Sequence, residues 1–194
     1  MQPATGGLSR ARSRSAIEAV GPLTAGRLAF LVFLGILSVV MHETVRLPLQ
    51  LPGHHGLEAM ALLVIARLSC THPFSASITA LSSAAASTAI GAGHGWVSPF
   101  LIVLPGLVMD VGMLALKRLS LTAVLVALPF VAAVAHATKP LLRLGLWQGW
   151  GMHFGSFRHG AAWPIYTHLA FGFIGALIAV VMWYGWYRAT RREA

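Results

Sequence analysis

The sequence predicts an all-α integral membrane protein that forms a single bundle of about six transmembrane helices. Of its 194 residues, 57% are hydrophobic and only 10% are charged, whereas roughly a quarter of the residues of a soluble globular protein are charged. The mean hydropathy of +0.74 agrees with this assignment. The length suits about six spans of roughly 20 residues with short connections. We therefore expect a basic flexible N-terminal tail over residues 1–18 and a six-helix transmembrane domain over residues 19–190.

Six apolar segments account for the expected spans. Residues 1–18 contain arginines, serines and glycines without apolar periodicity, so a tail is expected there, with a cleaved signal segment as the alternative. The second span is short and carries Glu58 and Arg67, and the last ends in an aromatic belt followed by Arg188. The expected spans cover residues 22–41, 53–68, 74–92, 97–116, 121–137 and 163–187.

Two of these spans have features that indicate helix contacts. The third contains small residues at a spacing of four, which let another helix approach closely, either within this bundle or from another subunit. The fourth is interrupted at Pro105-Gly106 and then carries Asp110. An intramembrane carboxylate is costly, so we expect Asp110 to bond another helix or pair with Arg67 or Lys117, with proton coupling or a subunit contact as the alternative. The small residues of the third span, at their spacing of four, are Ala76, Ala80, Ala84, Thr88 and Ala92.

The distribution of basic residues predicts the orientation. Six spans put both termini on one side, and cytoplasmic loops carry the excess of lysine and arginine. With cytoplasmic termini, the inner side receives Arg10, Arg12, Arg14, Arg27, Arg67, Lys117, Arg118, Arg188, Arg191 and Arg192, and the outer side Arg46, Lys139, Arg143 and Arg158. We expect a multi-pass protein of the inner (plasma) membrane. Topology therefore explains the net charge of +9, and nucleic acid is not an expected partner.

The same topology places eight of the nine histidines on the outer side, with only His72 inside. The stretch from Leu51 to Glu58 is the most concentrated, with two imidazoles and a carboxylate. If a helix continues through Gly56, Glu58 can meet His54 at a spacing of four or His55 at a spacing of three. The candidate substrate-binding residues are His42, His54, His55, Glu58, Arg158 and His168, and the candidate metal ligands are His54, His55, Glu58 and His168.

The connection from Lys139 to Ala162 is expected to be a long loop. Its cations, tryptophans and glycines suit a lid over the outer site. An interfacial helix anchored by its leucines is the alternative for the first part. In the last span, His168, Gly172 and Ala176 share a face, so His168 is expected to point toward the bundle.

Several marked functional classes are missing from the sequence. A GxxxxGK[ST] phosphate loop does not occur, so ATP-driven transport would need a partner. HExxH and GxSxG motifs do not occur either, and we expect a protein that is not an enzyme. Cys70 is the single cysteine, which excludes an intramolecular disulfide and a cysteine-based metal cluster.

Two segments have a distinctive composition: Thr167–Leu177 contains two glycines, and Ala25-Gly26-Arg27-Leu28-Ala29 places two alanines four residues apart on the first span. In these segments, and in size and span number, the chain resembles the substrate-binding S components of energy-coupling factor transporters, which present two alanines at this spacing to their partner on the first helix. The resemblance implies capture of a micronutrient from outside and delivery through a transmembrane coupling subunit driven by ATPase subunits. Cobalt- and nickel-specific members begin with Met-His, whereas this chain begins Met1-Gln2.

The substrate and the function class remain open at this point. Imidazole and carboxylate suit nickel, cobalt or zinc as the substrate, whereas the loop arginines and tryptophans suit a vitamin-like molecule. One alternative is a membrane redox protein with b-type haem between His168 and either His42 or His54. Another is a stand-alone metal permease or an accessory subunit. No cofactor is expected beyond a transition metal ion as substrate.

Overall fold

A computed structural model describes residues 22–45, 51–92, 95–158 and 160–192, and in these ranges the only regular secondary structure is helical. The structure therefore confirms the all-α prediction for the described residues. The first 21 residues, which include the expected tail, lie outside them. The helices are α2 (Ala25–Thr44), α3 (Gly56–Ser69), α4 (Ser75–Ala89), α5 (Ser98–Leu116), α6 (Leu121–Trp150), the short 3₁₀ helix η1 (Gly155–Phe157) and α7 (Ala162–Arg192).

Four of the described helices, α2, α5, α6 and α7, are long and apolar enough to cross a membrane. Helices α3 and α4 contain 14 and 15 residues, which at about 1.5 Å per residue is near 21 Å, short of a hydrocarbon core of about 30 Å. The expectation of six spans is therefore met in part: the described residues form six α-helices, of which four have the length of a full span. Pro52-Gly53 before α3 and Pro73 before α4 limit the two short helices.

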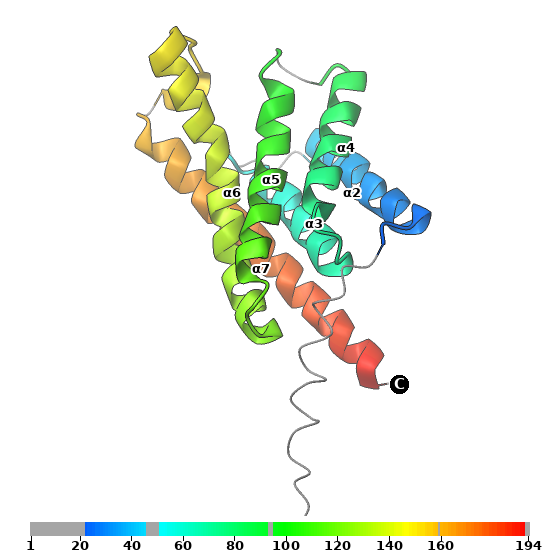
Figure 1. The fold of residues 1–194 in the computed structure, drawn as a ribbon. Helices are drawn as coiled ribbons and strands as arrows, with labels where there is room; N and C mark the ends of the chain where they lie inside the picture. Colours follow the sequence, from blue (N-terminus) through cyan, green and yellow to red (C-terminus); the bar gives the residue numbers. More distant parts are fainter. Residues whose placement is uncertain (1–21, 46–50, 93–94, 159, 193–194) are drawn as a thin grey trace, which may run out of the picture.

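The helices run in alternating directions, so α2 begins and α7 ends at the same end of the bundle, the lower one in Figure 1. Helix α3 contacts every other described α-helix and is the centre of the arrangement. The remaining contacts follow the order α2, α4, α5, α6 and α7. The start of α3 therefore lies at the end of the bundle where α2 and α4 finish and where α5 and α7 begin.

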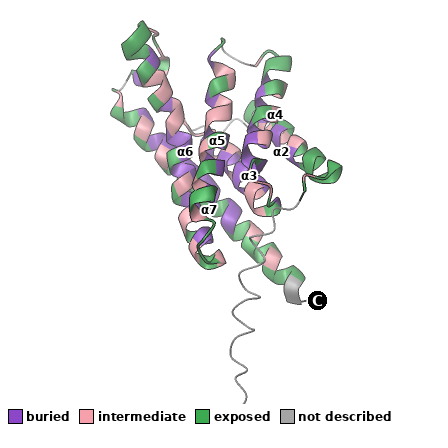
Figure 2. Cartoon of the chain, viewed as in Figure 1, coloured by how far each residue is buried: buried purple, intermediate pink, exposed green. Residues whose placement is uncertain are grey.

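The outer surface of the bundle is strongly apolar. In Figure 2 the buried residues line the helix faces that meet one another, and exposed residues cover the outside. Many of these exposed residues are large hydrophobics; Val111 is 66% and Val181 63% exposed. A soluble monomer rarely exposes large continuous apolar patches, so this surface supports insertion into a membrane.

The small residues of α4 pack within the bundle, against α2 on one side and α5 on the other. A Cβ on Gly35 of α2 would lie 2.5 Å from the Thr79 carbonyl oxygen, and one on Gly106 of α5 would lie 2.6 Å from Cβ of Ala80. Ala76 and Ala80 are almost completely buried. Of the two interpretations of this ridge, internal packing is the one that the structure supports.

The expected loop from Lys139 to Ala162 is wrong in its first part, which is helical as in the alternative interpretation but continues α6 and is not a separate interfacial helix. Helix α6 continues through Pro140 to Trp150, and Gly151 ends it with a left-handed φ of 67°. Proline removes one backbone N–H but is tolerated in transmembrane helices, where neighbouring helices and local adjustments compensate. The connection is therefore residues 151–161, and Trp147 stacks on Phe157 at 5.5 Å between ring centroids.

Candidate metal-binding cavity

The stretch before α3 forms a tight turn that sets the position of the histidines. Gly53 has a φ of 82°, a conformation that favours glycine, and the helix begins at Gly56 with His55 as its N-cap. A Cβ on Gly56 would collide with the ring of His136. The helix begins at Gly56, so His55 at its N-cap can reach Glu58 three residues later. His54 lies in the turn before it.

Three residues from two helices bring metal-ligating atoms together, and we call them the histidine cluster: His42, His55 and Glu58. Each offers one ligand atom, and these atoms lie within 4.8 Å of one another. Nδ1–H of His55 donates a hydrogen bond to Oε1 of Glu58 at 2.8 Å, and the His42 and His55 rings lie 3.9 Å apart between centroids. Imidazole and carboxylate suit nickel, cobalt and zinc.

The burial of the histidine cluster is graded. Glu58 is buried, His55 is intermediate and His42 at the end of α2 is exposed. Ligand atoms around one ion lie about 3 to 3.5 Å apart when each bond is about 2.0–2.2 Å long, so a bound ion would draw the three side chains closer. The exposed His42 has the freedom to make that movement, whereas the hydrogen bond from His55 holds Glu58.

A cavity of about 190 Å³ opens beside the cluster and is lined by His42 and His55. It extends between α2, α3, α4 and α5, where the buried hydroxyls of Thr79, Ser83 and Ser87 form one wall. Met60 and Leu101 contribute apolar surface. A dry cavity of roughly 150 Å³ holds a benzene molecule, so the space suits a small ligand or a hydrated ion.

Two cations from the second half of α6 also line this cavity, Lys139 and Arg143. They are four residues apart and interact electrostatically with one another, and Lys139 interacts in the same way with Glu58. The guanidinium carbon of Arg143 lies 5.8 Å from the ring centroid of Phe154 in the connection. The residues in this part of α6 were expected to form a loop above the membrane, and the structure places these two in the cavity wall.

A second pair of histidines, His136 and His168, lies buried beside the turn. Their rings stack at 4.6 Å between centroids. Nε2–H of His136 donates to the Gly53 carbonyl at 3.2 Å, and Nδ1–H of His168 donates to the Pro164 carbonyl at 2.7 Å. His168 therefore points into the bundle as expected, where it supports the turn that carries His54 and His55.

The sequence-predicted site residues fall into two groups. His42, His55 and Glu58 come together, with His42 added to the expected metal ligands. His54 has its ring 4.0 Å from that of His55 but donates from Nδ1–H to the Leu51 carbonyl at 2.7 Å. The other residues do not join the cluster: His168 packs on His136, and Arg158 is exposed in the connection.

Sequence reasoning named none of His136, Lys139 and Arg143 as a site residue, although it assigned the cations of the expected connection from Lys139 to Ala162 to a lid over the outer site. These three residues lie on α6, which contacts α3 directly. The available signal was their spacing of three and four residues, which places all three near one face of a helix. That signal was hidden because the fifth span was expected to end at residue 137 and the connection to begin at Lys139.

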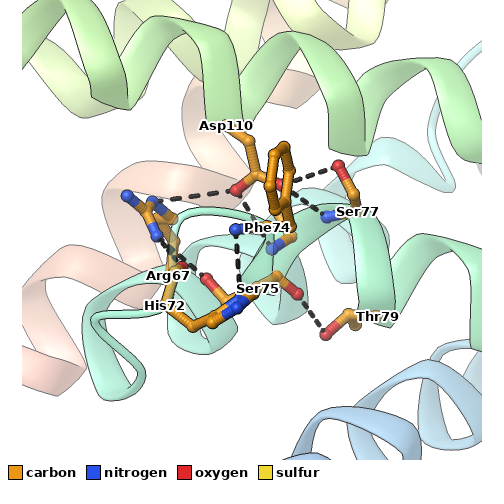
Figure 3. Close-up of polar contacts among 8 residues, drawn as sticks. Arg67, His72, Phe74, Ser75, Ser77, Thr79 and Asp110 are labelled. Atoms are coloured by element: carbon orange, nitrogen blue, oxygen red, sulfur yellow. Dashed lines mark hydrogen bonds and ion pairs between the residues drawn. The ribbon is translucent and has the colours of Figure 1, made fainter. Parts of the chain in front are cut away.

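At the opposite end of the bundle a second polar group, the aspartate cluster, is formed by Arg67, Ser75, Ser77 and Asp110 (Figure 3). The Asp110 carboxylate accepts from the N–H groups of Ala76 and Ser77 at 3.2 and 2.8 Å and from the Ser77 hydroxyl at 2.6 Å. Its Oδ1 lies 3.8 Å from Nε of Arg67. Asp110 thus caps the N-terminus of α4 from α5, which confirms the expectation of a helix-helix hydrogen bond and a pairing with Arg67.

The chain matches no family model, no curated protein and no solved structure. The functional interpretation therefore depends on the residues of the chain itself.

Proposed function

We propose that this chain is the substrate-binding subunit of a membrane uptake transporter and that its substrate is a transition metal ion. The observation that carries the proposal is the grouping of His42, His55 and Glu58 beside a cavity that His42 and His55 line, inside an apolar helix bundle. Ionisable side chains within a bundle of membrane helices are costly and often mark ion or substrate pathways. Nickel, cobalt and zinc are the ions that this ligand set favours.

The cluster is built for capture and release. Three protein ligands leave coordination positions open on a tetrahedral or octahedral ion, so an arriving ion can exchange water for imidazole stepwise. The exposed His42 would make the first contact, and the buried Glu58 would supply the negative charge. Glu58 also accepts from His55, so it can orient that ring as a carboxylate partner does in many metal sites.

The direction and the partners of uptake are part of the proposal. The excess of basic residues expected at the other end of the bundle supports a cavity that faces the outside of the inner (plasma) membrane. The chain contains no phosphate-binding loop, so we propose that a transmembrane coupling subunit and ATPase subunits drive uptake, as in the energy-coupling factor transporters. A vitamin-like substrate, a b-type haem protein and a stand-alone permease stay as alternatives.

The test is metal binding by two variants that differ by one position. We expect His55→Ala to weaken binding of nickel by about 10- to 100-fold, because it removes a ligand and frees Glu58. His54→Ala is the matched control, because the His54 ring lies next to that of His55 but donates to the Leu51 carbonyl. We expect the nickel affinity of this variant to stay within about threefold of the wild type. Isothermal titration calorimetry of the detergent-purified protein with Ni²⁺, Co²⁺ and Zn²⁺ gives the affinities.

Two results would reject this proposal. The first is a folded wild-type protein that binds none of the three ions. The second is equal loss of affinity in both variants, which would assign no special role to the histidine cluster. An absorption spectrum of the same sample detects haem, and uptake measured with and without the ATPase genes of the host separates the partner-dependent transporter from the stand-alone permease.

A further inference from the structure

The cations that share the cavity point to the form in which the metal arrives. We infer that the substrate is an anionic complex of the metal ion with a small carboxylate chelator, whose carboxylates bind Lys139 and Arg143. This inference rests on the proposed function, because it needs the histidine cluster to coordinate the metal. It names the chemical class of the ligand, which the cluster alone leaves open.

The charges around the cavity favour a complex over a bare ion. A divalent ion on His42, His55 and Glu58 leaves one net positive charge, because Glu58 supplies the single negative charge of the cluster. Lys139 and Arg143 line the same cavity, and like charges in a medium of low dielectric constant repel each other strongly. Glu43 also lines it and offsets one of these charges. A chelator with two or more carboxylates would neutralise the remainder.

The coordination number leads to the same ligand. The three protein atoms of the cluster would occupy three positions of a bound ion, which would leave one position in a tetrahedral site and three in an octahedral one. Water can fill these positions, but the carboxylate oxygens of a chelator can also fill them. In that arrangement the ion bridges the histidine cluster and the chelator.

The size of the cavity agrees with such a complex. Each water molecule takes about 30 Å³ of liquid volume, so a cavity of about 190 Å³ exceeds what a bare ion needs. Its walls supply hydroxyls from Ser38, Ser83 and Ser87 beside the apolar surface of Met60. These groups suit a small organic acid, which combines short carbon chains with hydrogen-bonding oxygens.

The two cations are arranged to bind carboxylates together. Lys139 and Arg143 are one helical turn apart on α6, so their side chains reach neighbouring positions. Nε of Arg143 is buried without a hydrogen-bond partner, and its guanidinium lies over the Phe154 ring. A guanidinium can bind a carboxylate through two parallel hydrogen bonds, one of which the unpaired Nε–H of Arg143 can donate, whereas a lysine ammonium supplies a compact charge.

The experiment compares nickel chloride alone, citrate alone and nickel with equimolar citrate, each added to the purified full-length protein. Native mass spectrometry reports whether nickel and citrate are bound together, and calorimetry gives the affinities. In the wild type we expect the protein to bind nickel and citrate together. In the double variant Lys139→Gln/Arg143→Gln we expect citrate to be lost, its affinity falling by about tenfold or more, while nickel alone still binds.

Controls separate charge, geometry and folding. The double variant Lys117→Gln/Arg118→Gln removes the same two charges at the opposite end of the bundle, and we expect it to keep the ternary complex. Arg143→Lys keeps the charge but not the two parallel hydrogen bonds, so its citrate affinity should lie between those of the wild type and the double variant. Nickel binding by each variant shows that its cavity is still folded.

The outcomes distinguish this inference from the proposed function. If nickel alone binds but citrate only competes for it and is never found on the protein, the inference is wrong and the proposed function stands. If citrate still binds with nickel after both α6 cations are replaced, the role of Lys139 and Arg143 is wrong. If the folded wild type binds neither nickel nor the complex, both fail.

Discussion

The two polar clusters of the bundle contain similar chemical groups but differ in how fully those groups are paired. In the aspartate cluster, Asp110 accepts three hydrogen bonds from α4 and lies 3.8 Å from Nε of Arg67. In the histidine cluster, one hydrogen bond joins His55 to Glu58, and the rings of His42 and His55 face a cavity. A carboxylate that accepts three hydrogen bonds from a neighbouring helix stabilises the contact between the helices, whereas imidazoles that face a cavity have ligand atoms left for a metal ion.

The position of each cluster in the bundle strengthens this contrast. The aspartate cluster joins α3, α4 and α5 near the end of α3, and its carboxylate is 2% exposed. The histidine cluster begins at the exposed His42, so a ligand can reach it. The comparison indicates that a carboxylate among membrane helices belongs to a binding site only when ligand atoms beside it are still available to bind a ligand.

The largest effect that we predict is on stability, from Asp110→Ala. The N–H groups of Ala76 and Ser77 would lose their acceptor and Arg67 would lose its counter-ion. Removing one partner of a buried charge pair costs about 3–5 kcal/mol of unfolding free energy. Thermal unfolding in detergent measures the loss, and nickel affinity measured well below the midpoint should stay within about twofold of the wild type.

Asp110→Asn is the control for this prediction, because it keeps an acceptor oxygen for the α4 N-terminus. We expect a smaller loss of stability than with alanine. If Asp110→Ala unfolds at the wild-type temperature and instead loses nickel binding, the contrast between the two clusters is wrong.

A medium effect is predicted for two glycines, one beside each cluster. In Gly106→Ala the new Cβ would lie 2.6 Å from Cβ of Ala80 and 2.8 Å from the Ala76 carbonyl oxygen, and in Gly56→Ala it would meet the His136 ring. Overpacking of this kind costs about 1–3 kcal/mol. We expect both to lower the unfolding temperature, but only Gly56→Ala to weaken nickel binding, because it displaces the start of α3.

Gly185→Ala is the matched control on α7, since a Cβ there has no neighbour within 4 Å. Alanine is favoured over glycine in a helix by about 0.5–1 kcal/mol, so this variant should be as stable as the wild type or more so. If Gly56→Ala and Gly106→Ala have equal nickel affinity, the position of the turn before α3 does not affect the histidine cluster. That result would contradict the assignment of nickel binding to this cluster.

The helices could be predicted from the sequence because apolar runs bounded by proline and glycine determine them locally. The predicted starts of the fourth and fifth spans, 97 and 121, lie within one residue of the observed starts, Ser98 and Leu121. The end of α6 could not be predicted, because proline normally ends a helix in water. Inside a bundle, neighbouring helices compensate for the missing hydrogen bond.

The site could be predicted only where its residues are close in sequence. The contact between His55 and Glu58 follows from their spacing of three, and His42 was included as a candidate because the sequence predicted it on the same side of the membrane. The contribution of Lys139 and Arg143 depends on how α6 packs against α3, which is a contact between distant parts of the chain. No local pattern encodes such a contact, so the cavity became visible only in the structure.

The smallest effect is predicted for Arg158→Ala, and it sharpens the boundary of the site. The sequence predicted Arg158 as a substrate-binding residue, but it is exposed in the connection after η1 and is not among the described residues that line the cavity. Exposed substitutions of this kind change stability by less than about 0.5 kcal/mol. We expect nickel and nickel–citrate affinities within about twofold of the wild type by calorimetry, in contrast to the loss of citrate on replacing Arg143. A tenfold loss in Arg158→Ala would mean that the connection closes over the cavity when the ligand binds, and the site would then extend beyond the helices.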